Sequence, residues 1–341
     1  MDVPIWVWAI TVGAIIAMLA VDYVGHVRTP HAPSLREATR WSIAYVAIAV
    51  AFGGVVWAVW GGTYGGEYFA GYITEKSLSV DNLFVFVLIM TSFRVPRDYQ
   101  QKVLLIGITV ALILRTVFIF LGAAIIENWA WVFYIFGAFL IWTAISQARA
   151  GTSHDEEFQE NGVLRLTRRL FPTTDTYVED KLTTKIDGRR FITPMLIVMV
   201  AIGSADLLFA VDSIPAIFGL TQETYLVFTA NAFSLLGLRQ LYFLIDGLLD
   251  RLVYLNYGLA AILGFIGVKL VIHALHTNEV PFINGGEHVT AIPEISTSVS
   301  LGFIVVVLAI TTVASLLADR RRRALVATED RREHPSPERA E

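Results

Sequence analysis

The sequence predicts an all-α bundle of about nine transmembrane helices, and three observations lead to this fold class. Hydrophobic residues make up 55% of the 341 residues, and the mean hydropathy is +0.60. Only 16% of the residues are charged, which leaves too little polar surface for a soluble protein, because soluble domains have about 25% charged residues. The apolar residues also fall into separate runs of about 20 residues, the length that a helix needs to cross a bilayer.

Nine runs of this kind follow one another along the chain. The third, sixth and seventh contain acidic residues and are weaker as plain apolar segments, but the basic residues and an internal repeat described below support them. The predicted spans are residues 4–25, 41–60, 69–93, 103–126, 129–148, 192–218, 225–249, 252–273 and 299–318.

The ends of the chain and one internal loop complete the predicted organisation. No Lys or Arg precedes the first apolar run, whereas a cleaved signal peptide has a basic n-region, so this run is expected to be a retained helix. Residues 149–191 form a long polar loop within a transmembrane domain that covers residues 1–318. In residues 319–341, four arginines at 320–323 are followed by few apolar residues, which predicts a disordered basic cytoplasmic tail.

The distribution of basic residues supports the count of nine spans and gives an orientation. With the N-terminus outside, 22 of the 26 Lys and Arg fall on the cytoplasmic side, and no outward loop contains one. The other four, Lys76, Arg115, Arg239 and Lys269, fall inside spans. Cytoplasmic loops have an excess of Lys and Arg, so we expect a multi-pass protein of the cell (inner) membrane with a cytoplasmic C-terminus.

Two short motifs indicate an internal repeat. Residues 75–82 in the third span and 206–213 in the sixth both consist of an acid, five residues, an acid and a small polar residue. The following spans each place one arginine, Arg115 or Arg239, near mid-membrane and before an aromatic-rich run. The third to fifth spans therefore match the sixth to eighth, and an offset of three helices inverts the second unit. Inverted repeats with polar sites on interrupted helices are typical of secondary transporters.

Carboxylates inside the membrane are the main indication of function. Burying them in hydrocarbon is costly, so intramembrane acids are functional candidates by default. The chain has no cysteine, which excludes disulfides, thiolate metal sites and cysteine nucleophiles. Asp22 is weaker evidence because it lies near the cytoplasmic end of the first span. The acids within spans are Glu75, Asp81, Asp206, Asp212 and Asp246.

Helix geometry limits what the two acids of each motif can do. Six residues rise about 9 Å and turn roughly 240°, so Glu75 shares a face with Ser79 and Asn82, while Asp81 points elsewhere. By the same spacing, Asp206 shares a face with Ala210 and Ser213 in the sixth span, and Asp212 does not. One cation therefore cannot contact both acids of an intact helix. Either two sites exist or the helices are interrupted.

Pro215 favours an interruption in the sixth span. Proline has no N–H to pair with the carbonyl of Val211. A freed carbonyl beside Asp212 and Ser213 would form a hard oxygen ligand set. Such sets suit Mg²⁺, Ca²⁺ and Mn²⁺ rather than thiophilic metals.

Charge pairing is the structural alternative for these acids. Arg115 and Arg239 are predicted to balance charge and could neutralise two of the acids. The acids still outnumber the available cations, because Lys269 lies near the outer end of its span, where it can snorkel to the surface. Asp246 lies near a cytoplasmic end and is expected to be structural. Asn231 could line the same cavity or form a helix–helix hydrogen bond.

Two other groups of residues are weaker candidates. His276, Glu279, Glu287 and His288 cluster in the outward loop 274–298, where a solvated loop is the simpler interpretation of a possible metal site. The glycines between the second and third spans lack the lysine of a phosphate-binding loop, so no nucleotide site is expected. We also expect no nucleic-acid partner.

Three segments resemble the TerC family of integral membrane proteins, which is named for tellurium resistance and includes manganese exporters. They are residues 75–82, 209–217 and 231–243, and the likeness extends over the second to eighth spans. The resemblance implies that Glu75, Asp81, Asp206 and Asp212 handle metal. Many relatives have a Glu three residues before the first acid of the second motif, where this chain has Gly203.

Together, the motifs and the resemblance predict a transporter that exports a divalent cation, with Mn²⁺ as the implied substrate and no permanently bound cofactor. The bilayer and the cation are the expected partners. The alternative is a non-transporting membrane component of a tellurite or metal-stress resistance complex. No enzymatic activity is expected, because the Gly-x-Gly-Asp turn of intramembrane aspartyl proteases is absent. The residues predicted to contact the metal are Glu75, Asp81, Asn82, Asp206, Asp212 and Ser213.

Overall fold

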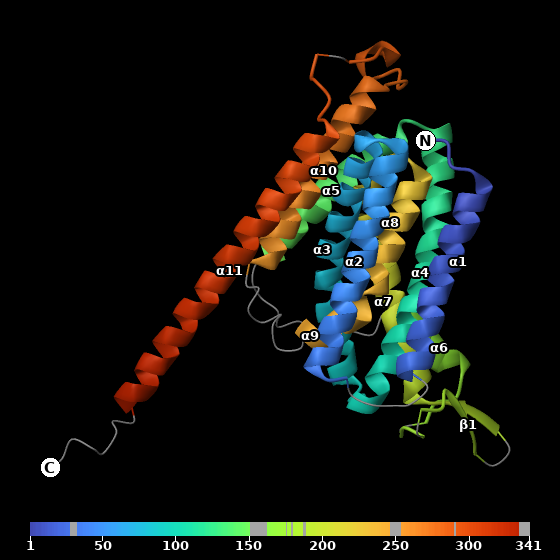
Figure 1. The fold of residues 1–341 in the computed structure, drawn as a ribbon, viewed down its shortest axis with the longest axis vertical. Helices are drawn as coiled ribbons and strands as arrows, with labels where there is room; N and C mark the ends of the chain where they lie inside the picture. Colours follow the sequence, from blue (N-terminus) through green and yellow to red (C-terminus); the bar gives the residue numbers. More distant parts are fainter. Residues whose placement is uncertain are drawn as a thin grey trace.

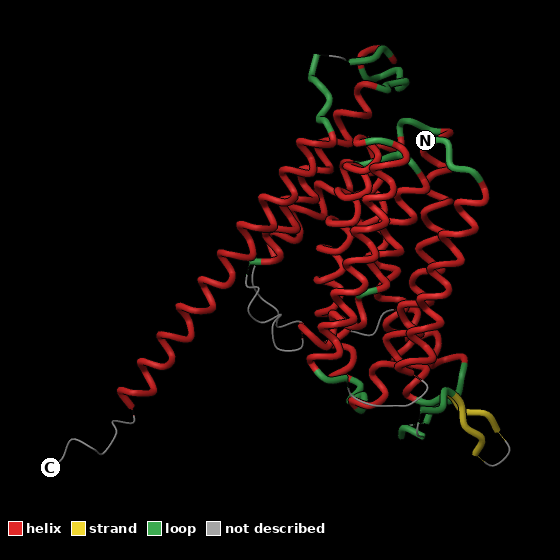
Figure 2. Tube along the Cα trace, in the orientation of Figure 1, coloured by secondary structure: helices red, strands yellow, loops and turns green. Residues whose placement is uncertain are grey.

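The structure is a computed structural model that describes residues 1–27, 33–150, 162–174, 176–178, 180–186, 189–245, 254–289 and 291–333. It is an all-α bundle, as predicted, with one short β-hairpin at one end (Figures 1 and 2). Its elements are α1 (Ile5–Asp22), the π-helical turn η1 (Tyr23–Val27), α2 (Leu35–Trp60), α3 (Gly62–Ser92), α4 (Arg97–Asn128), α5 (Val132–Ala150), α6 (Gly162–Leu170), β1 (Thr183–Ile186), β2 (Arg189–Ile192), α7 (Pro194–Phe218), α8 (Thr224–Leu236), α9 (Leu238–Ile245), α10 (Leu255–His276), the 3₁₀ turn η3 (Asn284–Gly286) and α11 (Thr297–Glu333).

Seven helices in the described part of the chain are long and apolar enough to cross a membrane: α1, α2, α4, α5, α7, α10 and α11. The third and seventh predicted spans correspond to α3 and to α8 with α9. The helix α3 has 31 residues but contains several charged ones, and α8 has only 13 residues. Both pack among the apolar helices, which bury polar side chains of α3 and α8 such as Glu75 and Asn231.

The α2–α3 connection shows why glycine is required at one turn. Gly61 alone joins the two helices, with φ +98° and ψ 170°, a conformation that a residue with a Cβ rarely adopts. The predicted loop of several residues before the third span is therefore a single-residue turn. The helix α3 begins at Gly62 instead of near residue 69, so its first two turns lie where the loop was expected.

The long loop contains structure that its polar composition did not predict. The strands β1 and β2 pair as an antiparallel hairpin at the end of the bundle opposite the N-terminus (Figure 1). Nearby, Tyr177 donates a hydrogen bond to the carbonyl of Phe93, and Lys102 donates to the carboxylate of Asp180. The hydrogen bond from Lys102 lowers the pKa of Asp180. These contacts fix the hairpin region to the α3–α4 turn.

The predicted disordered tail differs from the structure. The helix α11 continues past its membrane span to Glu333 and extends away from the other helices (Figure 1). The residues after Ala318 include several Arg, Ala, Leu and Glu, which are strong helix formers. Their charge excluded a membrane span but not a solvated helix. Residues 334–341 lie outside the described part.

The packing of the helices agrees with an inverted repeat. A two-fold operation between the repeats would exchange α3 with α7, α4 with α8–α9, and α5 with α10. The contacts follow this exchange, because α3 packs on α8 while α4 packs on α7, and α5 lies along α10. The equivalent helices α3 and α7 also touch each other near the expected axis.

Glycines allow α5 and α10 to approach closely. A Cβ at Gly137 would lie 2.8 Å from the Gly267 carbonyl oxygen, and a Cβ at Gly267 would lie 2.9 Å from the Gly137 oxygen. We expect Gly267→Ala to destabilise the protein by about 1–3 kcal/mol, because backbone atoms cannot move aside as a flexible side chain can. Melting in detergent tests this. Gly264→Ala on the same helix is the matched control, since its Cβ would meet Ala144 at an ordinary 3.5 Å. Equal melting temperatures for the two variants would contradict the close packing.

The interruption predicted at Pro215 is wrong, and a different span is broken. The helix α7 runs without a break from Pro194 to Phe218, because Pro215 lies in its last turn and removes one hydrogen bond near an end. The seventh span breaks at Gly237, which separates α8 from α9. A Cβ at Gly237 would lie 3.2 Å from Lys76 Nζ and 3.3 Å from Tyr45 Cβ, which is tighter than ordinary contact, so glycine allows close packing there.

The predicted orientation can be tested with single cysteines in this cysteine-free chain. We expect Phe282→Cys to react with an impermeant reagent outside the cell, because Phe282 is 88% exposed in the α10–α11 connection. Ile186→Cys in the hairpin at the opposite end should react only after the membrane is permeabilised. Outside labelling at Ile186 would contradict the orientation.

Candidate functional site

The first acids of the two repeat motifs come together at the centre of the bundle. Glu75 on α3 and Asp206 on α7 are each 0% exposed, and both contact Arg115 on α4. Arg115 Nε and Nη2 donate to the two carboxylate oxygens of Asp206 at 2.7 and 3.0 Å. Arg115 Nη1 donates to Glu75 Oε2 at 3.0 Å. The two motifs therefore contain acids that lie close together in the structure, although they are 131 positions apart in the sequence.

The polar residues on the same helix faces complete the cluster around Arg115. Its Nη1 also donates to Ser213 Oγ at 3.1 Å. With the Asn82 amide oriented to satisfy both of its ends, the Asn82 oxygen accepts from Arg115 Nη2 at 3.3 Å, and its nitrogen donates to Leu78 O. All five guanidinium N–H groups then have acceptors. Four of the six predicted metal-contacting residues, Glu75, Asn82, Asp206 and Ser213, thus surround a guanidinium.

The second acids of the motifs occupy different positions. Asp212 is half-buried on α7 and makes no ion pair within 4 Å among the described residues, although it lies close enough to interact electrostatically with Arg115 and Glu75. Its different placement from Asp206 agrees with the face predicted for an intact helix. Asp81 belongs to α3, but its side chain is outside the description, as is the whole of Asp246.

Two residues of the broken seventh span, Asn231 and Ser234, border the cluster. Asn231 Nδ2 donates to Glu75 Oε1 at 2.9 Å, while its buried Oδ1 has no hydrogen-bond partner in the described part of the chain. Ser234 Oγ lies 3.3 Å from Ser79 Oγ. Lys76 Nζ donates to the Ser234 carbonyl at 3.1 Å, in the last turn of α8, where helical carbonyls lack amide partners.

The sequence analysis assigned no role to Lys76 or Ser234. Gly237 could have predicted the break in the seventh span, because glycine weakens a helix and often follows its last residue. A helix that ends there leaves free carbonyls beside the acids of α3.

Arg239, which was predicted to balance charge, pairs with Asp22 and not with Glu75, Asp206 or Asp212 in the described part of the chain. Arg239 Nη2 donates to Asp22 Oδ1 at 2.9 Å, and Nη1 donates to Gln101 Oε1 at 2.8 Å. Asp22 is buried in the structure, at 1% exposure, and also accepts from Gln240. The break at Gly237 places Arg239 on a separate helix, where it lies beside α1 rather than beside the site acids. Arg115 occupies the position between the repeats that was expected for both arginines.

The described side chains include no group of three or more His, Asp or Glu that could hold a metal. In the outward loop, His276 Nε2 contacts the Ile292 carbonyl, and His288 Nδ1 contacts the His276 carbonyl. These imidazoles hold the loop backbone instead of gathering with Glu279 and Glu287. The solvated-loop interpretation fits this arrangement better than a metal site.

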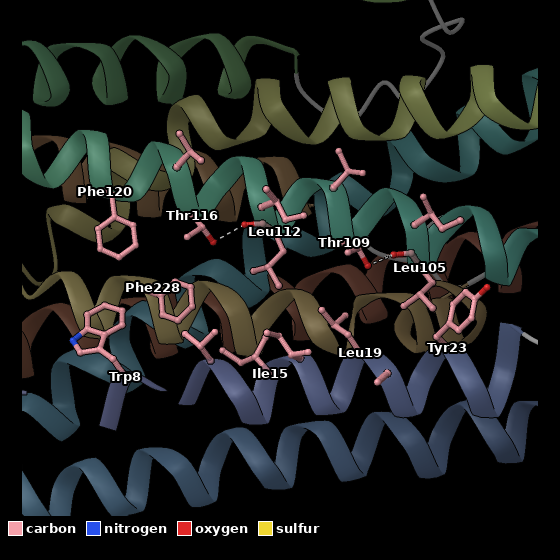
Figure 3. Close-up of a pocket in the computed structure, with 17 residues that line it drawn as sticks. Trp8, Ile15, Leu19, Tyr23, Leu105, Thr109, Leu112, Thr116, Phe120 and Phe228 are labelled. Carbon is pink, nitrogen blue, oxygen red and sulfur yellow. Dashed lines mark hydrogen bonds between the residues drawn. The ribbon is translucent and has the colours of Figure 1, made fainter. Parts of the chain in front are cut away.

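Two cavities at the surface have different chemistry. A polar one of about 690 Å³, at the end of the bundle opposite the β-hairpin, is lined in part by Glu67, Lys269, His273 and Glu294. An apolar groove of about 750 Å³ runs between α1 and α4, from Trp8 to Tyr23 (Figure 3). Its two threonines, Thr109 and Thr116, donate to carbonyls of their own helix, and the groove has no carboxylate in its lining.

The fold and the buried acid cluster define a polytopic integral membrane protein with ionised side chains at its centre. The chain matches the model described as "Integral membrane protein TerC family" over residues 60–323. It belongs to the TerC family. The helix α1, which supplies Asp22, lies before the matched region.

Several relatives match this chain over most of their length. An "Uncharacterized membrane protein" of Mycobacterium tuberculosis is 54% identical over 319 residues, 93% of this chain and 80% of the relative. One of Myxococcus xanthus is 39% identical over 313 residues, 92% of each chain. The Escherichia coli protein named "Putative membrane-bound redox modulator Alx" is 38% identical over 266 residues, 75% of this chain and 82% of the relative. No solved structure matches the chain.

Proposed function

We propose that the protein exports a hard divalent cation, Mn²⁺ in preference to others, through a site formed by Glu75 and Asp206 together with the neighbouring Asp212. One observation supports this most strongly: two fully buried carboxylates, at equivalent positions of two inverted repeats, meet at the centre of the bundle. Transporters built from inverted repeats bind substrate near the bilayer midplane at the interface of the repeats.

The donor atoms favour a hard cation. The cluster offers carboxylate, amide and hydroxyl oxygens from Glu75, Asp206, Asn231 and Ser213, and the chain contains no thiol. Oxygen ligands suit Mg²⁺, Ca²⁺ and Mn²⁺. Two acids face one guanidinium, and the Asp212 carboxyl lies close enough to interact electrostatically with it. The described cluster therefore has more carboxyl groups than guanidinium groups, and a cation would compensate these carboxyl groups.

The alternative is a non-transporting component of a resistance complex. The pairing of both acids with Arg115 favours it, because a buried ion pair can simply fasten helices together. One relative is named as a redox modulator. A redox role of this chain would have to work without a cysteine thiol of its own.

Cation-dependent melting of the purified protein separates these two functions. A ligand that binds only the folded state stabilises it by about 2.7 kcal/mol at one hundred times its Kd. We expect Mn²⁺ to raise the melting temperature more than Mg²⁺, Ca²⁺ or Zn²⁺ at equal concentration. The absence of stabilisation by all four ions would favour the non-transporting function, and the largest effect with Zn²⁺ would contradict a hard site.

A further inference from the structure

Arg115 lies where a cation shared by both repeats would lie. It bridges Glu75 of one repeat and Asp206 of the other, and it uses both oxygens of the Asp206 carboxylate. A divalent cation bound to the same carboxylates would be close to the guanidinium. The two positive charges would repel each other strongly in a site from which water is excluded. The side chain and the cation therefore compete for one position.

The Asn231 amide has a buried oxygen atom to which the Arg115 guanidinium donates no hydrogen bond. Asn231 is 0% exposed, and its Oδ1 has no partner in the described part of the chain, although its Nδ2 contacts Glu75. The five N–H groups of Arg115 are already used by other acceptors. A metal ion beside Glu75 accepts oxygen ligands from several directions, so it would satisfy an acceptor that Arg115 does not reach.

In a transport cycle, this competition would assist the return of the empty site. After release of the cation, an exporter must return its empty site to the cytoplasmic side. Uncompensated carboxylates are unfavourable in the membrane interior, which would make that return slow. The guanidinium of Arg115 places a positive charge between Glu75 and Asp206. Because this charge is part of the protein, it can remove much of the barrier in every cycle.

We propose that the Arg115 guanidinium and the exported cation occupy the carboxylates of Glu75 and Asp206 in turn, and that Arg115 is the counter-ion of the empty site during its return. This inference rests on the proposed function. It makes Arg115 a positioning residue for the return step and not a ligand of the cation.

Two modes of Mn²⁺ movement in reconstituted vesicles test the proposal. Exchange of labelled for unlabelled Mn²⁺ uses only the loaded site, whereas net flux also requires the empty site to return. For Arg115→Gln we expect the ratio of exchange to net flux to rise at least tenfold over the wild type. The control is Arg149→Gln, at an exposed arginine in the last turn of α5, and it should leave the ratio unchanged.

Arg115→Lys is the second variant, because it keeps a positive charge and is expected to fold even if Arg115→Gln does not. An ammonium cannot hold two carboxylates through a planar fork, so a smaller rise in the ratio is expected. An unchanged ratio in the folded Arg115 variants would overturn the role of Arg115 while leaving the proposed function intact. Wild-type vesicles that support neither exchange nor net flux would instead contradict the proposed function.

Discussion

Asp212→Asn should abolish the response of the protein to Mn²⁺ while its fold persists. The substitution keeps the shape of the side chain and removes its charge. Asp212 is half-buried and makes no ion pair among the described residues, so its neutralisation leaves no buried cation without a partner. We expect a melting temperature within a few degrees of the wild type, loss of stabilisation by Mn²⁺, and loss of manganese tolerance in cells that depend on the protein.

Asp98→Asn is the matched control for this prediction, because Asp98 is exposed in the first turn of α4. It should leave melting, the effect of Mn²⁺ and manganese tolerance unchanged. If charge pairing with Arg115 were the whole role of the acids, Mn²⁺ would have no effect on the melting of either protein. An Asp212→Asn protein that retains both the Mn²⁺ response and manganese tolerance would exclude Asp212 from the metal site.

Arg239→Leu should have the largest effect on stability. Arg239 and Asp22 are 2% and 1% exposed and form an ion pair at 2.9 Å. Removal of one partner of a buried pair leaves the other charge uncompensated, which costs about 3–5 kcal/mol. Mn²⁺ should not rescue this variant, because the structure places Arg239 with Asp22 rather than with the cluster at Arg115.

The double variant Asp22→Asn with Arg239→Leu provides the control. Neutralising both partners removes the unpaired charge, so the double variant should recover part of the stability lost in Arg239→Leu. A double variant less stable than either single one would show that the pair is not the source of the effect. Rescue of Arg239→Leu by Mn²⁺ would instead return Arg239 to the metal site.

The spacing of polar residues predicted the central cluster because helix periodicity is local. The faces of Glu75 with Asn82 and of Asp206 with Ser213 follow from helix geometry alone, and the four side chains meet at Arg115 as those faces require. The motifs also indicated which helices are equivalent, and the packing of α3 on α8 and α4 on α7 agrees with that assignment.

Partners of single charges could not be predicted in the same way. Asp22 and Arg239 are 217 positions apart, and their contact depends on how α1 and α9 pack, which no local pattern reveals. The position of the helix break also differs from the one that local helix propensities predict. Proline is the stronger helix breaker, yet α7 tolerates Pro215 near its end, whereas α8 ends just before Gly237, where Tyr45 and Lys76 lie close to the backbone.

Mn²⁺ flux into sealed vesicles that contain only the purified protein tests the central claim most directly. Inside-out vesicles present the cytoplasmic side to the medium, so export appears as accumulation. We predict accumulation of Mn²⁺ above that of Mg²⁺, Ca²⁺ and Zn²⁺ by wild-type vesicles, and accumulation no greater than that of protein-free vesicles for Asp212→Asn. Wild-type vesicles that accumulate none of the four ions, or an Asp212→Asn protein that matches the wild type, would contradict cation export through this site.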